Sequence, residues 1–169
     1  MICKWKGVVL AVMPTLVFAY ESSLPETISD QAKNHMQTMP DPLTLKTYPA
    51  ADDVTGWDAI NQALEERLRP NNQAVIKRFE PTITNKIINS VPVIEVLPKG
   101  WKDNGKVMVY AHGGAYTRYN AQMTLLRCIP VANETGLKVI SVDYTTAPKG
   151  NYQTITDEVI AVFKALNPA

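Results

Sequence analysis

The most constraining feature of this sequence is a short apolar run that leads into two consecutive glycines. Val107–Ala111 has the composition of a strand that is covered on both faces, as the strands of parallel sheets are. His112 follows, and then Gly113 and Gly114. Glycines let a backbone turn sharply while its N–H groups stay free to face a ligand. The run therefore predicts a buried parallel strand that ends in a ligand-facing loop.

The segment downstream supplies a helix and a second strand. Apolar residues recur at helical spacing, and Gly136 is suited to end the helix. The residues on this apolar face are Leu125, Cys128, Ile129 and Ala132. Residues 138–144 then form a second apolar strand. Since a helical connection joins parallel neighbours, we predict a right-handed βαβ unit.

The glycine loop, followed by Asp143-Tyr144 and then Ala147-Pro148, resembles the hormone-sensitive-lipase-like branch of the α/β-hydrolases. The resemblance covers roughly residues 75 to 166. It implies that the Gly113 and Gly114 N–H groups form an oxyanion hole for hydrolysis of a small-molecule ester, with His112 as loop support. The alternative for a Gly-Gly pair after a strand is a plain turn.

The sequence departs from the family pattern at two places. Ala115 stands where a third loop glycine is usual, and Thr145-Thr146 stands where the family shows Arg-Leu. Neither change removes a backbone N–H, although a Cβ at position 115 restricts φ and narrows the pocket. The substrate therefore does not follow from the resemblance.

The chain contains no G-x-S-x-G nucleophile elbow. In this fold the catalytic base follows the nucleophile along the chain, so His112 is not expected to be that base. The serine, the acid and the histidine of a catalytic triad are therefore all missing from this sequence. We expect the N-terminal part of an exported carboxylesterase or lipase. The alternative is a non-catalytic exported α/β module that keeps the glycine loop as scaffold or ligand site.

The first 19 residues have the pattern of a secretory signal. Lys4 and Lys6 precede the apolar run 8–18, and Ala19 offers a cleavage site. The run is shorter than the ~20 residues that span a bilayer and contains Pro14, so we expect no stable membrane anchor and a secreted or periplasmic protein. Because the 17 basic and 16 acidic residues nearly balance, nucleic acid is not an expected partner.

Residues 20–70 are predicted to form a leader with cap-like helices, ahead of a partial α/β-hydrolase domain at 71–169. One short helix is expected at 25–39. An amphipathic helix follows, begun by Asp53 or Thr55 and ended by Pro70. Its apolar stripe consists of Trp57, Ile60, Leu64 and Leu68. In the resembling enzymes such helices contribute to a cap over the acyl pocket. The alternative is a helix that only buries its stripe.

The remaining elements complete an α/β fold with a short antiparallel start. Strands are predicted at 75–83 and 91–97, with Pro92 at an edge or a strand start. Thr154-x-x-Asp157 predicts the start of a final helix. The apolar face of this helix comprises Ile155, Val159, Val162, Phe163 and Leu166.

No metal is expected, because His35 and His112 lie far apart without neighbouring ligands. No cofactor is expected either, since no G-x-G-x-x-G follows either parallel strand. Cys128 is expected to pack in the core, and Asp143 to brace the loops near Tyr144 and Pro148. In the resembling fold the 107–112 strand lies between the 139–144 strand and the next one, which carries the nucleophile. Its unpaired edge predicts self-association.

Overall fold

The computed structural model describes residues 24–40, 44 and 48–167. Contacts divide the chain into two units, Met1–Thr47 and Tyr48–Ala169. The first holds one described helix, α1 (Asp30–Gln37), which Ser29 caps by accepting the Ala32 N–H at 3.2 Å. It is shorter than the helix expected at 25–39. The predicted signal at 1–19 lies outside the described residues. Among the described helices, none is both long and apolar enough to cross a membrane.

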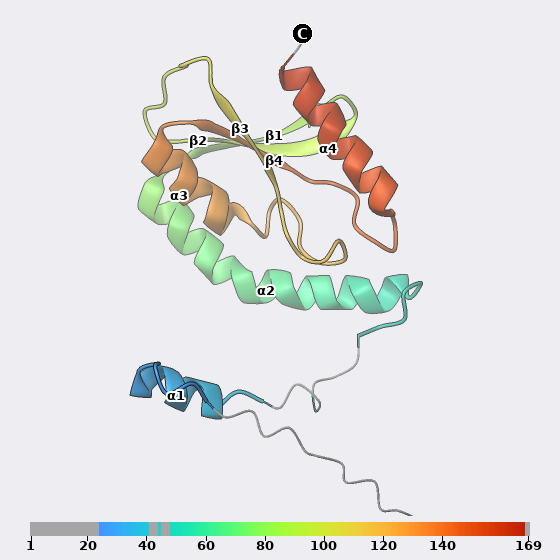
Figure 1. Ribbon diagram of the computed structural model, residues 1–169. Coiled ribbons are helices and arrows are strands. Elements are labelled where there is room, and N and C mark those ends of the chain that lie inside the picture. The colour runs from blue at the N-terminus through green and yellow to red at the C-terminus, as the bar shows by residue number, and fades with distance from the viewer. Residues whose placement is uncertain (1–23, 41–43, 45–47, 168–169) are drawn as a thin grey trace, which may run out of the picture. The chain divides into compact units, whose positions relative to one another are not determined.

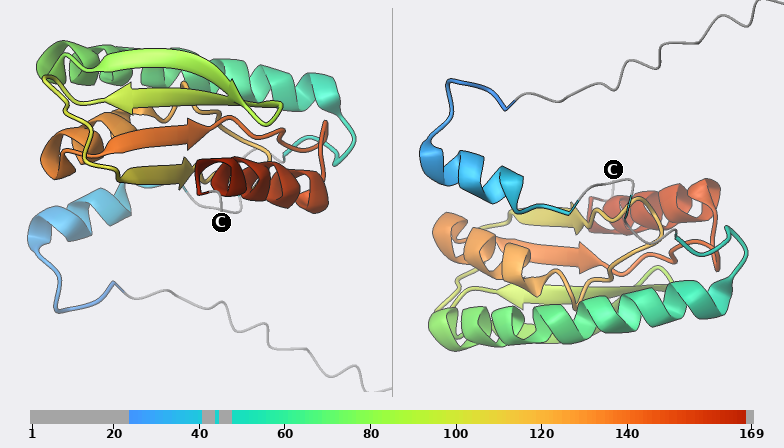
Figure 2. Two further views of the ribbon diagram at one scale, coloured as in Figure 1. Left: turned by 90° about the horizontal axis from the view of Figure 1, so that it is seen from above. Right: turned by 90° about the horizontal axis from the view of Figure 1, so that it is seen from below.

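The second unit is built on a four-stranded sheet in the order β1-β2-β4-β3. The strands are β1 (Thr82–Ile88), β2 (Val91–Leu97), β3 (Val107–Ala111) and β4 (Lys138–Val142). β2 pairs antiparallel with β1 and β4, while β3 and β4 are parallel (Figure 2). The predicted antiparallel start and parallel βαβ unit are therefore confirmed.

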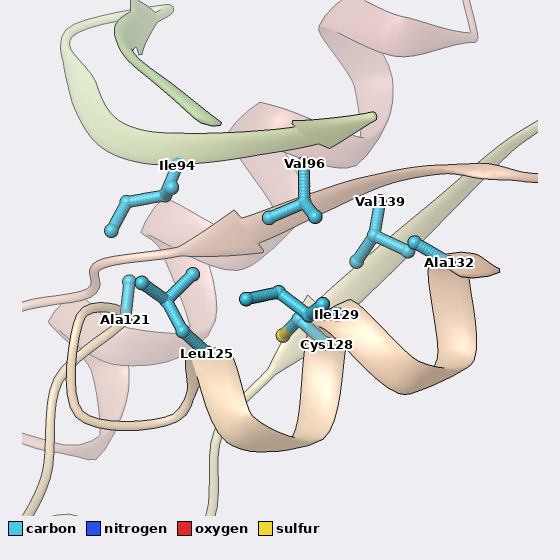
Figure 3. Packing of buried hydrophobic residues seen from close by; sticks show 8 residues of the cluster. All are labelled: Ile94, Val96, Ala121, Leu125, Cys128, Ile129, Ala132 and Val139. Atoms are coloured by element: carbon cyan, nitrogen blue, oxygen red, sulfur yellow. The ribbon is translucent and has the colours of Figure 1, made fainter. Parts of the chain in front are cut away.

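Helices cover both faces of this sheet. α2 (Val54–Phe79) and α3 (Leu125–Thr135) lie on one side, and α4 (Tyr152–Leu166) lies on the other (Figure 1). Alternate strand residues point to opposite faces, so neighbours on β4 enter different cores. Val139 packs against α3, whereas Ile140 belongs to the cluster on the α4 side. The α3 side buries the predicted helix face, including Cys128 (Figure 3).

The prediction that Pro70 ends the second helix is wrong. α2 continues through Pro70 to Phe79 and ends at Glu80, whose φ of 47° is left-handed. Proline fits helical φ and costs the bond to the carbonyl four residues earlier, so a well-packed helix can continue past it. Val75, Ile76 and Phe79 supply that packing against the α3-side core. For the same reason the strand expected at 75–83 begins only at Thr82.

Two smaller differences concern a strand and the last helix. Pro92 is the second residue of β2, at a strand start as predicted, although β2 is an interior strand. α4 begins earlier than Thr154, because Asn151 is the N-cap and accepts the Gln153 and Thr154 N–H groups at 3.0 Å. Ile155 and Val162 are buried as expected, whereas Phe163 is 57% exposed.

Candidate functional site: the glycine loop

The glycine loop leaves the carboxyl end of β3 in a conformation that needs one of its two glycines. At Gly114, φ is 129°, and a Cβ there would lie 2.1 Å from the Arg118 carbonyl oxygen. Gly113 is different, since a Cβ at that position would meet nothing within 4 Å. Packing therefore requires glycine at 114 but leaves open space beside 113.

The two glycine N–H groups have no acceptor within the described part of the chain. The Gly114 carbonyl is in use instead, accepting the Thr117 and Arg118 N–H groups at 3.2 and 3.0 Å. The Gly114 carbonyl thus forms a tight turn with the residues that follow it, while the N–H groups of both glycines stay unpaired. Unpaired backbone donors at a cavity wall are suited to bind a negatively charged oxygen.

The third loop position, Ala115, is strained. Its φ is 54°, and Tyr116 after it has a φ of 61°. Side chains with a Cβ rarely adopt this region, which costs roughly 1–2 kcal/mol for each such residue. A Cβ at position 115 restricts φ, as noted from the sequence. The loop nevertheless takes the left-handed conformation that a glycine would take.

His112 is buried at the base of the loop. Its Nδ1 lies 2.9 Å from the Gly113 carbonyl oxygen and 3.1 Å from the Tyr144 hydroxyl. The Tyr144 hydroxyl donates to the His112 carbonyl, and the two rings stack with centroids 4.0 Å apart. Burial lowers the pKa of His112 and raises that of Tyr144 to about 12.

These contacts fix the tautomer of His112. A carbonyl oxygen can only accept a hydrogen bond, so the neutral ring carries its hydrogen on Nδ1. Nε2 is then the unprotonated nitrogen, and it has no partner among the described residues. His112 thus contacts the backbone at Gly113.

Helix α2 holds the far side of the loop through Asn61. Its Oδ1 accepts the Tyr119 N–H at 2.9 Å, and its Nδ2 donates to the Thr117 carbonyl at 3.0 Å. The end of the loop is also tied to the start of α2, because the Arg118 guanidinium lies over the ring of Tyr48, which stacks on Trp57.

A second asparagine of α2, the buried Asn72, fixes the start of α3. Its Oδ1 accepts the Leu126 N–H at 2.7 Å, and its Nδ2 lies 3.2 Å from the carbonyl oxygens of Gln122 and Met123. Asn61 and Asn72 are 11 residues apart, which is about three helical turns, so both face the same side of α2. Sequence reasoning missed both residues, although this spacing was a usable signal.

Asp143 braces the loop from β4. Its Oδ1 accepts the Ala121 N–H at 2.8 Å, so the carboxylate holds the segment before α3 rather than the turn at Pro148. That turn is joined to the glycine loop separately, since the Ala147 N–H donates to the Tyr116 carbonyl at 2.8 Å. Asp143 therefore has a structural role, but the prediction that it braces the loops near Tyr144 and Pro148 is wrong.

A cavity of about 350 Å³ lies beside the glycines on the α3 side of the sheet. It is lined by Leu68, Asn71, Tyr110, Gly113, Gly114, Tyr119, Met123, Thr124, Leu126 and Arg127. Of the apolar residues that were predicted for one face of α2, Leu68 lines this cavity, whereas Trp57 does not. The larger cavity, about 720 Å³, lies between β3 and α4, away from the glycines.

Within the described residues, no group of three or more His, Cys, Asp or Glu side chains is placed to hold a metal ion. Cys128 is a buried free thiol, and burial raises its pKa to about 11. A thiol with so high a pKa stays protonated at neutral pH and is a poor nucleophile. The chemistry that this part of the chain offers therefore centres on the loop's backbone donors.

Comparisons with known proteins place this geometry in a fold class. Residues 108–169 match the family described as alpha/beta hydrolase fold. Esterase E25 is 22% identical with a TM-score of 0.66, over 96% of this chain and 48% of that one. Esterase LipW from Mycobacterium marinum is also 22% identical, with a TM-score of 0.58 over 74% and 43% of the two chains. An esterase of the bacterial hormone-sensitive lipase family is 19% identical, with a TM-score of 0.50 over 65% and 41%.

The chain has the N-terminal part of an α/β-hydrolase fold, which is the fold that the resemblance noted in the sequence implied. It spans less than half the length of these solved structures. No curated protein matches the chain.

Proposed function

We propose that this chain is the N-terminal part of an exported carboxylic-ester hydrolase of the esterase and lipase type, acting on small-molecule esters. The observation that carries the proposal is the pair of unpaired N–H groups at Gly113 and Gly114, beside a cavity and at the end of a parallel strand. Solved esterases with the same fold support it.

In this proposal the two glycine N–H groups stabilise the oxyanion that forms when a nucleophile attacks the ester carbonyl. Negative charge grows on the carbonyl oxygen in the transition state, and donors already in position stabilise it without reorganising. One such donor is typically worth ~10²–10³ in turnover. His112 acts only by holding the Gly113 backbone.

The proposal requires a nucleophilic serine, an acid and a base from polypeptide beyond the printed sequence. The printed sequence contains no G-x-S-x-G, and this observation favours the second candidate, a non-catalytic exported module that uses the loop as scaffold or ligand site. The two candidates differ in what the gene encodes after Ala169.

Sequencing the gene beyond codon 169 separates the candidates. An in-frame or single-frameshift G-x-S-x-G within a few dozen codons supports the hydrolase, and unrelated sequence supports the module. In the hydrolase, the joined polypeptide should react with a fluorophosphonate probe, whereas these 169 residues alone should not. Gly113→Ala in the joined protein should fold normally, since its Cβ enters open space, and should lower kcat/KM, because that space belongs to the cavity proposed for the ester.

We further propose that residues 1–19 act as an export signal and that β3 mediates self-association. Export rests on Lys4, Lys6 and the apolar run that follows. A secreted or periplasmic protein that begins at Tyr20 in mass spectrometry would support it, and an intact Met1 in soluble cytoplasmic protein would oppose it. Self-association rests on the position of β3 at the edge of the described sheet.

A further inference from the structure

The cavity beside the glycine loop is positively charged. Its lining includes one cation, Arg127, and no carboxylate, together with Gly113 and Gly114, whose N–H groups are unpaired within the described residues. The hydroxyl-bearing residues Tyr110 and Thr124 add polarity. Since every charge on this wall is positive and the backbone groups donate, the cavity is complementary to an anion.

Arg127 is the one charged residue that lines this cavity, and its guanidinium has no acidic partner within the described part of the chain. Some cations of the second unit are paired, as Lys86 is with Glu95 and Lys149 is with Asp58. Arg127 is the third residue of α3, so the helix that Asn72 anchors also sets its position at the cavity. The planar fork of an arginine is suited to bind a carboxylate with two parallel hydrogen bonds.

The surroundings of Arg127 agree with this placement. Tyr110 and Arg127 both line the cavity, where burial raises the pKa of Tyr110 and the charge of Arg127 lowers it. Leu68 and Met123 supply apolar wall between the polar groups. A volume of about 350 Å³ is near the lower end of the range for small-ligand pockets, so a short molecule fits.

We propose that this cavity takes a short ester that carries a free carboxylate, the half-ester of a dicarboxylic acid, and that Arg127 binds the carboxylate. The inference rests on the proposed function, in which the Gly113 and Gly114 N–H groups bind the carbonyl oxygen of the reacting ester. The carboxylate contact itself is independent of any reaction. Arg127 is thus the residue that selects the substrate class.

The test is a titration of the full 169-residue chain, ¹⁵N-labelled, with monomethyl succinate and with the neutral dimethyl succinate. The half-ester should bind about tenfold more tightly than the diester and shift the Arg127 side-chain Nε–H signal, since a hydrogen bond to a charged group typically supplies this much. Arg127→Gln should abolish the preference. Arg69→Gln is the matched control, because it removes the same charge from a residue that lines a different cavity.

Equal binding of the two esters, or a preference that survives Arg127→Gln, would overturn the inference. The Gly113 and Gly114 amide signals report on the proposed function separately. If both esters shift them equally, the ester site stands and the carboxylate contact is wrong. If the half-ester shows its Arg127-dependent preference while the glycine signals stay unmoved, the carboxylate contact stands and the oxyanion proposal fails.

Discussion

At the scale of single residues, the backbone of the glycine loop is strained at the position where the resembling enzymes usually have a third glycine. Ala115 has a φ of 54°, where glycine carries no Cβ penalty. We expect Ala115→Gly to raise the free energy of unfolding by about 1 kcal/mol, because relief of strain exceeds the added freedom of the unfolded chain. Urea denaturation measures the change.

Ala132→Gly provides the matched control for this prediction. Ala132 lies inside α3, where the same substitution should lower the free energy of unfolding by about 1 kcal/mol or more. If Ala115→Gly destabilised the protein as the control does, the left-handed conformation at position 115 would be contradicted.

His112 predicts a pH dependence of stability. Burial lowers its pKa in the folded chain, so below the unfolded value of about 6.5 the unfolded state binds more protons. The stability that neutral His112 contributes is therefore fully present above pH ~6.5 and decreases as the pH falls through the window between the two pKa values.

The measurement is urea denaturation between pH 5 and pH 7.5. His112→Asn, whose amide can still donate to the Gly113 carbonyl, should show a weaker loss of stability on acidification than the natural chain. His35→Asn is the matched control, because it removes the other histidine of the sequence, which is exposed on α1. An unchanged profile in His112→Asn would show that the imidazole does not titrate differently on folding.

At the scale of elements, α2 organises the site through its buried asparagine. Asn72→Ala would leave the Leu126 N–H without its acceptor, so we expect a loss of about 1–3 kcal/mol in unfolding free energy and faster hydrogen exchange at the start of α3. Gln73→Ala, an exposed change on the same helix, should cost little. Equal effects of the two substitutions would refute this role for Asn72.

The elements that the sequence predicted correctly are those with a strong local period. α3 has its apolar face as expected and ends at Gly136, and β3 and β4 are short apolar runs between clear turn signals. The sequence predicted that α2 ends at Pro70, because proline is a local stop signal. The helix continues to Phe79 because its residues from Val75 onward pack against the core. Asn61 was missed because its partners in the glycine loop, Thr117 and Tyr119, are more than 50 residues away.

At the scale of the whole molecule, β3 is the edge strand of the described sheet and offers apolar surface beside it. Val107 is 37% exposed and Phe163 57% exposed, and both line the cavity between β3 and α4 together with Val109. We expect the chain to dimerise or aggregate through this edge. Sedimentation velocity at several concentrations measures it.

Val109→Lys tests the edge directly. A charge on β3 should reduce assembly if the edge drives it, although some stability is lost because Val109 packs against the α4-side core. Val131→Lys, on an exposed position of α3, is the control and should leave assembly unchanged. A natural chain that sediments as a monomer and melts cooperatively would disprove the prediction.

The contacts of Asn61 and Asn72 also limit how the length of this chain can vary. Each residue inserted into a helix turns everything beyond it by about 100°, so one extra residue between the two asparagines would swing one of them away from its partners. Insertions before Asp53 or in the turn between β2 and β3 disturb no such match. Natural variants of this protein should therefore differ in length in those places and keep the interval from Asn61 to Asn72 constant.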